Sequence, residues 1–246
     1  MFGRKTQPPT VPHTPAISLD KVPTQLVSLA KAAGTSLEKS GLSGQRAAVY
    51  LVVDRSLSMR PYFANGSVQH LADQALGLSV NLDDDGTVPL VLFDSRPYPI
   101  VDVRLDRYQG VVAQQHTLHG GDRTMGGTQY TIAMRAVIEH YIASEPADPA
   151  LVIFQTDGTP QDEEDTRLQL MQASKLPMFW SFVGFGPHKV QFLTDLDKMR
   201  GRLLDNASYF HAGAAPTGLA DGVVYDGITK EFGQWVPQAR AKGLLS

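Results

Sequence analysis

Three short polar segments of this chain carry side-chain oxygens at spacings that suit a hard cation. An Asp-x-Ser-x-Ser motif offers a carboxylate and two hydroxyls at alternate positions, so that all three can face the same side of an extended loop. A Gly-Gly-Thr sequence adds a third hydroxyl, and a Thr-Asp-Gly sequence adds a second carboxylate. Oxygen is the donor that Mg²⁺ and similar cations prefer. The candidate metal ligands are Asp54, Ser56, Ser58, Thr128 and Asp157.

The first motif by itself has an ordinary explanation, because Asp and Ser after a strand are common helix caps and turn formers. The elements before and after the three segments strengthen the metal hypothesis. Residues 47–53 and 151–155 are apolar runs without alternation, typical of strands buried on both faces of a sheet. In such sheets ligands bind beyond the carboxyl ends of the strands. We therefore expect the three segments to converge there.

The rest of the chain alternates between strand and helix patterns. Further strands are expected at 88–93, 178–183 and 207–211, with 98–103 as an antiparallel hairpin partner at the sheet edge. Helices are expected at 24–39, 61–81, 130–142, 190–199 and 219–235, and another begins with the acidic residues 162–164, which the helix dipole favours. The glycine-rich residues 120–127 are expected to form a long flexible loop. This order predicts an α/β fold with a doubly wound, mostly parallel sheet, helices on both faces and one antiparallel edge strand.

Composition bounds the domain organisation and the partners. Residues 1–16 hold four prolines and are expected to be a disordered arm, either a mere tail or a peptide ligand. We expect residues 17–45 to form a helical extension and residues 46–240 to form the main domain. The net charge of −3 gives no field that would gather nucleic acid. The absence of cysteine excludes disulfides and thiolate metal sites, and fits a reducing compartment. No apolar segment follows the basic start, and none approaches the about 20 residues that span a bilayer. We expect a cytoplasmic protein without membrane insertion.

The three motifs, in this order, resemble the metal-ion-dependent adhesion site of von Willebrand factor A domains, and the resemblance covers residues 46–236. It implies a Rossmann-like A-domain fold in which Ser56, Ser58 and Thr128 coordinate the metal through hydroxyls. Asp54 and Asp157 would hold it directly or through waters. It also implies Mg²⁺ as the metal, with Mn²⁺ or Ca²⁺ as alternatives, and a partner protein that offers an Asp or Glu carboxylate. Leu57 departs from the pattern, since many family members have glycine there.

A narrower resemblance comes from the wording around the first motif, Gly-Gln-Arg-Ala-Ala-Val-Tyr-Leu-Val-Val-Asp-Arg-Ser-Leu-Ser-Met, together with short matches at 27–29 and 36–39. It is similar to the bacterial A domains associated with tellurium resistance and stress response, the TerF-like domains. This resemblance implies a cytoplasmic role in a stress-response assembly.

Several other functions compete with that of a metal-dependent binding module. A phosphatase that uses Asp54 as its nucleophile would need an acid two residues later, where the chain has Ser56, and no hydrolase elbow or phosphate loop is present. We therefore expect that the protein is not an enzyme. His116, His119 and Asp122 suggest a zinc site, but solvated loop histidines are favoured. The aspartates at 83–85 lack calcium-loop spacing and fit a turn. A metal-independent scaffold remains the rival from another class.

Overall fold

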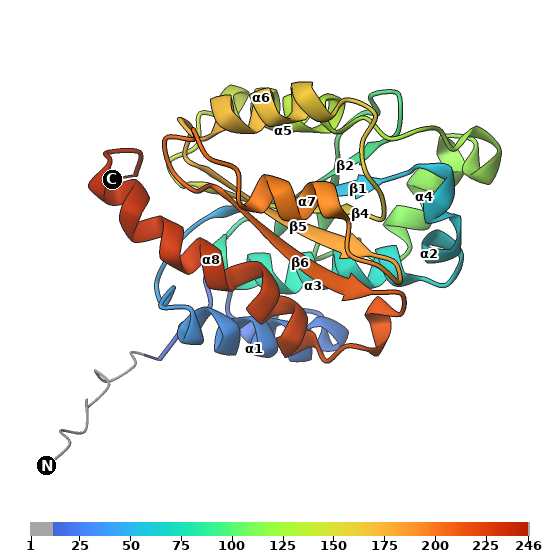
Figure 1. Ribbon diagram of the computed structural model, residues 1–246. Coiled ribbons are helices and arrows are strands. Elements are labelled where there is room, and N and C mark those ends of the chain that lie inside the picture. Colours follow the sequence, from blue (N-terminus) through green and yellow to red (C-terminus); the bar gives the residue numbers. More distant parts are fainter. Residues whose placement is uncertain (1–11, 246) are drawn as a thin grey trace, which may run out of the picture.

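The computed structural model describes residues 12–245 and places a single mixed sheet at the centre of this part of the chain (Figure 1). Within the described residues the sheet has six strands in the order β3-β2-β1-β4-β5-β6. Their bounds are β1 (Ala48–Asp54), β2 (Thr87–Phe93), β3 (Val101–Arg104), β4 (Ala150–Thr156), β5 (Met178–Phe185) and β6 (Ala207–Gly213). All neighbouring strands run parallel except β2 and β3. The expected α/β class with one antiparallel edge strand is confirmed.

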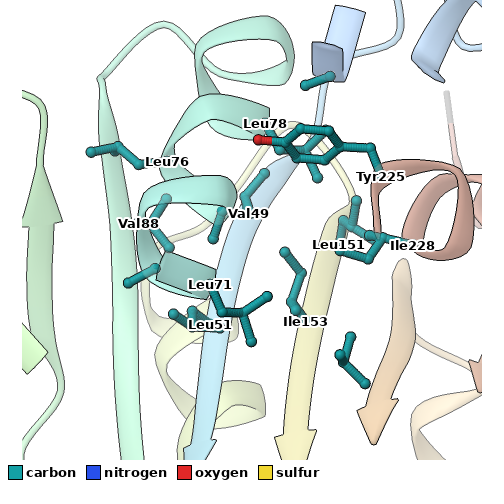
Figure 2. Close-up of a cluster of buried hydrophobic side chains, with 14 of the residues drawn as sticks. Val49, Leu51, Leu71, Leu76, Leu78, Val88, Leu151, Ile153, Tyr225 and Ile228 are labelled. Carbon is teal, nitrogen blue, oxygen red and sulfur yellow. The ribbon is translucent and has the colours of Figure 1, made fainter. Parts of the chain in front are cut away.

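Helices cover both faces of the sheet (Figure 1). The described helices are α1 (Thr24–Lys39), α2 (Arg60–Ala64), α3 (Ser67–Leu82), α4 (Val111–Leu118), α5 (Tyr130–Ala143), α6 (Glu163–Ala173), α7 (Gln191–Asp197) and α8 (Asp221–Ala241). Helices α3 and α8 pack on one face, with α1 across their outer side, whereas α5, α6 and α7 cover the other face. The two faces give two separate hydrophobic clusters, and Figure 2 shows β1 and β4 side chains meeting α3 and α8 in the first.

Continuous apolar runs explain why β1, β4 and β5 lie in the middle of the sheet. Every residue of β4 and β5 is buried, and so is every residue of β1 after the first. A strand with helices on both faces has no solvent side, so neither set of alternate side chains can be polar. The central strands are therefore the elements that sequence predicts most directly.

The chain reverses its winding direction between β1 and β4. From β1 it proceeds through α3 to β2 on one side, whereas after β3 it returns through α5 to β4 on the other side. The carboxyl ends of two strands that part in this way leave a crevice, which is the usual ligand site of open α/β sheets. Asp54 ends β1 and Asp157 directly follows β4, so the two candidate carboxylates flank this point.

The prediction of one continuous helix at 61–81 is wrong, because the structure has two helices there. Helix α2 ends at Ala64 and α3 begins at Ser67, with Gly66 between them at φ +80°. A left-handed residue stops the α-helical hydrogen-bond ladder, and glycine adopts that conformation without strain. The Asn65 side-chain oxygen then accepts hydrogen bonds from the Ser67 nitrogen at 3.0 Å and hydroxyl at 2.7 Å, which restarts the helix.

The segment before Thr128 is more ordered than the expected long loop. Helix α4 precedes it, and residues Gly121–Thr124 form one 3-10 turn. Only two residues of α4 are buried, Val111 and Val112, so its apolar periodicity is too weak to predict a helix. The edge hairpin is present, but its second strand starts at Val101 rather than at Tyr98.

The expected N-terminal arm lies largely outside the described residues, which begin at position 12. The backbone nitrogen of His13 donates to a carboxylate oxygen of Glu38 in α1 at 2.6 Å. Among the described helices, none combines the length and the apolar character needed to cross a membrane.

Candidate metal centre

The oxygens of the first motif and of Asp157 form a continuous chain at the carboxyl ends of β1 and β4. The Ser56 and Ser58 hydroxyl oxygens are 3.1 Å apart, and the Ser58 hydroxyl donates to Asp157 Oδ1 at 2.8 Å. Asp54 Oδ1 accepts from the Ser56 backbone nitrogen at 2.7 Å, which folds the loop back over the end of the strand. The structure therefore brings four of the five candidate ligands into direct contact.

The spacing of these oxygens suits a small octahedral cation. Mg²⁺ binds oxygen at about 2.0–2.1 Å, so two neighbouring ligands of an octahedral ion lie about 3 Å apart. The separations of 3.1 Å and 2.8 Å along Ser56, Ser58 and Asp157 have this length. Two carboxylates and three hydroxyls also form a hard donor set without nitrogen or sulfur, which favours Mg²⁺, Mn²⁺ or Ca²⁺ over zinc or copper.

Neither candidate carboxylate has a positive side chain beside it. Within residues 12–245, Asp54 and Asp157 form no ion pair with Lys, Arg or His. Burial raises the pKa of Asp54 to about 7, against hydrogen bonds from Thr156 and Ser56 that lower it. Burial likewise raises the pKa of Asp157, against the hydrogen bond from Ser58. Removing a carboxylate from water disfavours its charged form, and a bound cation would reverse this effect.

Thr128 lies on a loop that the other segments hold beside this chain of oxygens. The backbone of Gly126 pairs with Ser56, and its carbonyl accepts from the Leu57 nitrogen at 3.1 Å. The Thr128 carbonyl accepts from the Gln161 nitrogen at 2.8 Å. Among the described residues, the Thr128 hydroxyl makes no hydrogen bond to the other four candidates. The backbone contacts thus place the loop next to the site.

Both glycines before Thr128 lie where other segments approach the backbone closely. A Cβ on Gly126 would lie 2.9 Å from the carboxyl carbon of Asp94, and one on Gly127 would lie 2.6 Å from the side-chain oxygen of Gln161. The Gly127 nitrogen also donates to the Ser95 hydroxyl at 3.1 Å. Loops from the ends of β1, β2 and β4 therefore converge on this segment, which explains the Gly-Gly-Thr sequence.

Comparison with known proteins identifies the family of this chain. Residues 46–245 match the family described as "vWA found in TerF C terminus". The chain belongs to the TerF-like family of von Willebrand factor A domains. Domains of this kind commonly mediate protein interactions.

The proteins that are similar to this chain include a bacterial relative and two solved structures. The A domain is 30% identical over 210 residues to the Uncharacterized protein YcbR of Bacillus subtilis (strain 168), which covers 85% of each chain. Among solved structures, the VWA domain of SpRpn10 superposes with a TM-score of 0.52 at 10% identity, covering 73% of this chain and 94% of that one. Proximal thread matrix protein 1 of the mussel byssus gives a TM-score of 0.49 at 14% identity, and the match covers 78% of this chain and 47% of that protein. At 10% identity the likeness to the SpRpn10 domain shows the fold alone.

Thr156 supports the site, and the sequence patterns did not single it out. Its hydroxyl donates to Asp54 Oδ2 at 2.6 Å, so that both oxygens of the buried carboxylate are engaged. The Tyr130 hydroxyl donates in turn to Thr156 at 3.2 Å and to the Gly158 carbonyl at 2.5 Å. The signal that could have found it is its place beside Asp157, at the end of the strand neighbouring β1.

Asp162 has a role different from the expected one. The acidic residues Glu163 and Glu164 lie in the first turn of α6, as expected from the helix dipole. The Asp162 carboxylate, however, accepts hydrogen bonds from the Tyr130 and Thr131 nitrogens, both at 3.0 Å. It therefore caps α5, the helix that follows Thr128, and ties it to the segment after Asp157.

The description of His116 as a solvated loop residue is wrong. His116 lies in α4 with its side chain only 12% exposed, stacked on Phe63 at 4.4 Å between ring centres. It contacts Asp122 at 2.9 Å, whereas the ring of His119 packs against Tyr98. In the part of the chain that the structure describes, no three His, Cys, Asp or Glu side chains are arranged to hold a metal. These histidines are thus packing residues.

Proposed function

We propose that this A domain binds one divalent cation, Mg²⁺ in the first place, and uses it to hold a carboxylate of a partner protein. The ligands would be Asp54, Ser56, Ser58, Thr128 and Asp157, with Mn²⁺ or Ca²⁺ as alternative metals. The observation that carries the proposal is the chain of oxygens from Ser56 through Ser58 to Asp157, spaced like the neighbouring ligands of an octahedral ion.

The choice of ligands explains why the metal would bind a second protein. Two carboxylates balance the charge of a divalent ion. The negative charge of the fully buried Asp54, however, is already shared with two hydrogen-bond donors. Neutral hydroxyls complete the set, and Ser58 is exposed. A cation held in this way keeps a strong preference for one more oxygen ligand. An Asp or Glu side chain of a partner would supply it.

The family supports a proposal for the biological setting. The match to the A domain of TerF supports a place in a bacterial assembly for tellurium resistance and stress response, and we place the protein in the cytoplasm. We also propose that it is not an enzyme. A phosphatase that used Asp54 as its nucleophile would need an acid two residues later, and Ser56 stands there.

One observation favours a metal-independent scaffold as the second candidate. The site oxygens of Ser56, Ser58 and Asp157 contact one another, so the loops hold together through hydrogen bonds alone. A scaffold of this kind would bind its partner equally well with and without metal.

Calorimetric titration of Mg²⁺, Mn²⁺ and Ca²⁺ into metal-stripped protein separates the two candidates. Asp54→Ala removes a buried carboxylate and Ser58→Ala removes an exposed hydroxyl, so the second variant tests the site with little risk to folding. Thr159→Ala changes an exposed side chain two residues after Asp157 and is the control. We expect saturable binding in the wild type and in Thr159→Ala, and loss of binding in the other two variants.

The open ligand position is tested with Mn²⁺ as the probe. Water exchanging on protein-bound Mn²⁺ enhances proton relaxation, and added acetate should reduce that enhancement as a carboxylate replaces water. Partner capture from cell extract should then disappear both with chelator and in Ser58→Ala. Binding of metal that is equal in wild type, Asp54→Ala and Ser58→Ala would refute the site. Capture that ignores chelator would favour the scaffold, and phosphatase activity lost in Asp54→Asn would establish an enzyme.

A further inference from the structure

Arg55, the second residue of the first motif, has its whole side chain inside the protein. Its side chain is 0% exposed, although its neighbours Asp54 and Ser56 are directed to the candidate metal centre. A buried guanidinium is costly unless it is paired and its N–H groups are satisfied. Within the described residues the buried Nε makes no hydrogen bond, so the partners of the two terminal nitrogens are the ones that offset this cost. They show what the residue does.

The terminal nitrogens of Arg55 donate to five residues from two other segments. Nη1 contacts Asp94 at 3.1 Å, the Tyr98 hydroxyl at 2.7 Å and the Thr124 carbonyl at 3.2 Å. Nη2 contacts the His119 carbonyl at 3.0 Å, the Gly121 carbonyl at 2.8 Å and the Thr124 hydroxyl at 2.6 Å. Three backbone carbonyls between positions 119 and 124 thus converge on one side chain, and the 3-10 turn is folded around it.

The same contacts extend to the loop that carries Thr128. Asp94 is 0% exposed and touches both Arg55 and Gly126, because its carboxyl group occupies the space that a Cβ of Gly126 would need. Gly126 in turn pairs with Ser56 and binds the Leu57 nitrogen. The backbone of Gln129 also donates to the Asp94 carbonyl at 3.3 Å. The buried pair of Arg55 and Asp94 therefore supports residues 126–129 from inside the protein.

We propose that Arg55 is a positioning residue for the metal centre, whose buried guanidinium holds residues 119–126 against the first motif and so sets the place of Thr128. The inference rests on the proposed function, because the place of Thr128 matters to metal only if the site binds one. It adds a residue that points away from the metal and acts through a loop. Lysine cannot replace it, since a single ammonium lacks the planar fork whose two terminal nitrogens lie within hydrogen-bond distance of six acceptor atoms.

A nearby arginine provides a matched control. Arg60 contacts Asp122 at 2.6 Å and therefore also joins the first motif region to the 3-10 turn. Its side chain is 61% exposed and that of Asp122 is 40% exposed, and ion pairs of this kind contribute little. Arg60→Lys should therefore leave metal binding within about twofold of wild type, whereas Arg55→Lys should weaken it about 10- to 100-fold, the usual effect of losing a residue that orients metal ligands.

A double-mutant cycle separates positioning from a general structural role. Thr128→Val removes the hydroxyl and should weaken Mg²⁺ binding in the wild type, yet change it little in Arg55→Lys, where the hydroxyl is already misplaced. Amide exchange at residues 119–128 should accelerate in Arg55→Lys and not in Arg60→Lys. Thr124→Val, which removes one Arg55 contact and keeps the side-chain shape, should act in the same direction more weakly, and it serves if Arg55→Lys does not fold.

The outcomes distinguish this inference from the proposed function. A wild-type protein that shows no saturable Mg²⁺ binding would overturn both. A wild type that binds Mg²⁺, with Arg55→Lys and Thr124→Val binding equally well, would overturn the role of Arg55 alone. Additive effects of Arg55→Lys and Thr128→Val would also overturn it, because the two residues would then act independently.

Discussion

Gly126→Ala should destabilise the A domain, although nothing about the backbone conformation at this position forbids alanine. The added Cβ would lie 2.9 Å from Asp94 Cγ and 3.1 Å from its Cβ and Oδ1. Asp94 cannot move aside, because it accepts from the Tyr98 hydroxyl at 2.6 Å, from the Arg96 nitrogen at 2.9 Å and from Arg55. Overpacking of a fixed interior costs about 1–3 kcal/mol.

Two other glycines at the same edge of the sheet provide a graded comparison. A Cβ on Gly127 would meet the ends of the Gln161 and Ser95 side chains, at 2.6 Å and 2.8 Å, and the exposed glutamine can turn away. A Cβ on Gly158 would meet nothing within 4 Å. Gly158→Ala should therefore be neutral, or stabilise by about 0.4–1 kcal/mol because it restricts the unfolded chain.

Urea unfolding in the presence of chelator measures this order directly. At a common slope, we expect the midpoint concentration to fall most for Gly126→Ala, less for Gly127→Ala, and not at all for Gly158→Ala. Mg²⁺ titration of the same variants should show the largest loss of affinity for Gly126→Ala. Equal midpoints for the variants at positions 126 and 158 would refute the reasoning, because they would show that the contact with Asp94 does not constrain the loop.

Three further predictions concern stability. The pKa of Asp54 is raised to about 7 in the folded chain. The free energy of unfolding of the metal-free protein should therefore fall as the pH rises from about 4 to about 7, by on the order of 4 kcal/mol in total. Asp54→Asn should flatten this fall in urea midpoints measured across that range, and parallel pH profiles would contradict the assignment. Asp162→Ala should cost about 0.5–2 kcal/mol in urea unfolding, because two N–H groups of α5 lose their acceptor, whereas Glu163→Ala should cost much less. Gly233→Ala would place a Cβ 2.1 Å from the Ser40 carbonyl and should lower the melting temperature by separating α8 from α1. Gly222→Ala in the same helix meets nothing within 4 Å and is its control, so equal melting temperatures would exclude the close approach.

Patterns that are local in the sequence predicted the sheet and four residues that meet at the candidate site. The apolar runs at 47–53 and 151–155 are typical of strands buried on both faces, and Asp54 and Asp157 follow them at the end where ligands bind. The break between α2 and α3 was missed, although Asn65 and Gly66 are ordinary helix-ending residues and the apolar stripe of the expected helix lies in α3 alone. Helix α4 was missed because it buries too few side chains to show a period.

The sequence by itself determined the fold class, the family and the order of the metal-ligand candidates, because these depend on strand periodicity and on residues that follow strand ends. Only the tertiary structure decided that Arg55 is buried, that Asp94 fills the space of a Gly126 side chain and that Asp162 caps α5. Each of these depends on two segments 30 or more residues apart meeting at one point. Neighbouring residues in the chain carry no signal of such a meeting, since whether a charged side chain faces solvent or a ring of carbonyls is set by the packing of the elements around it.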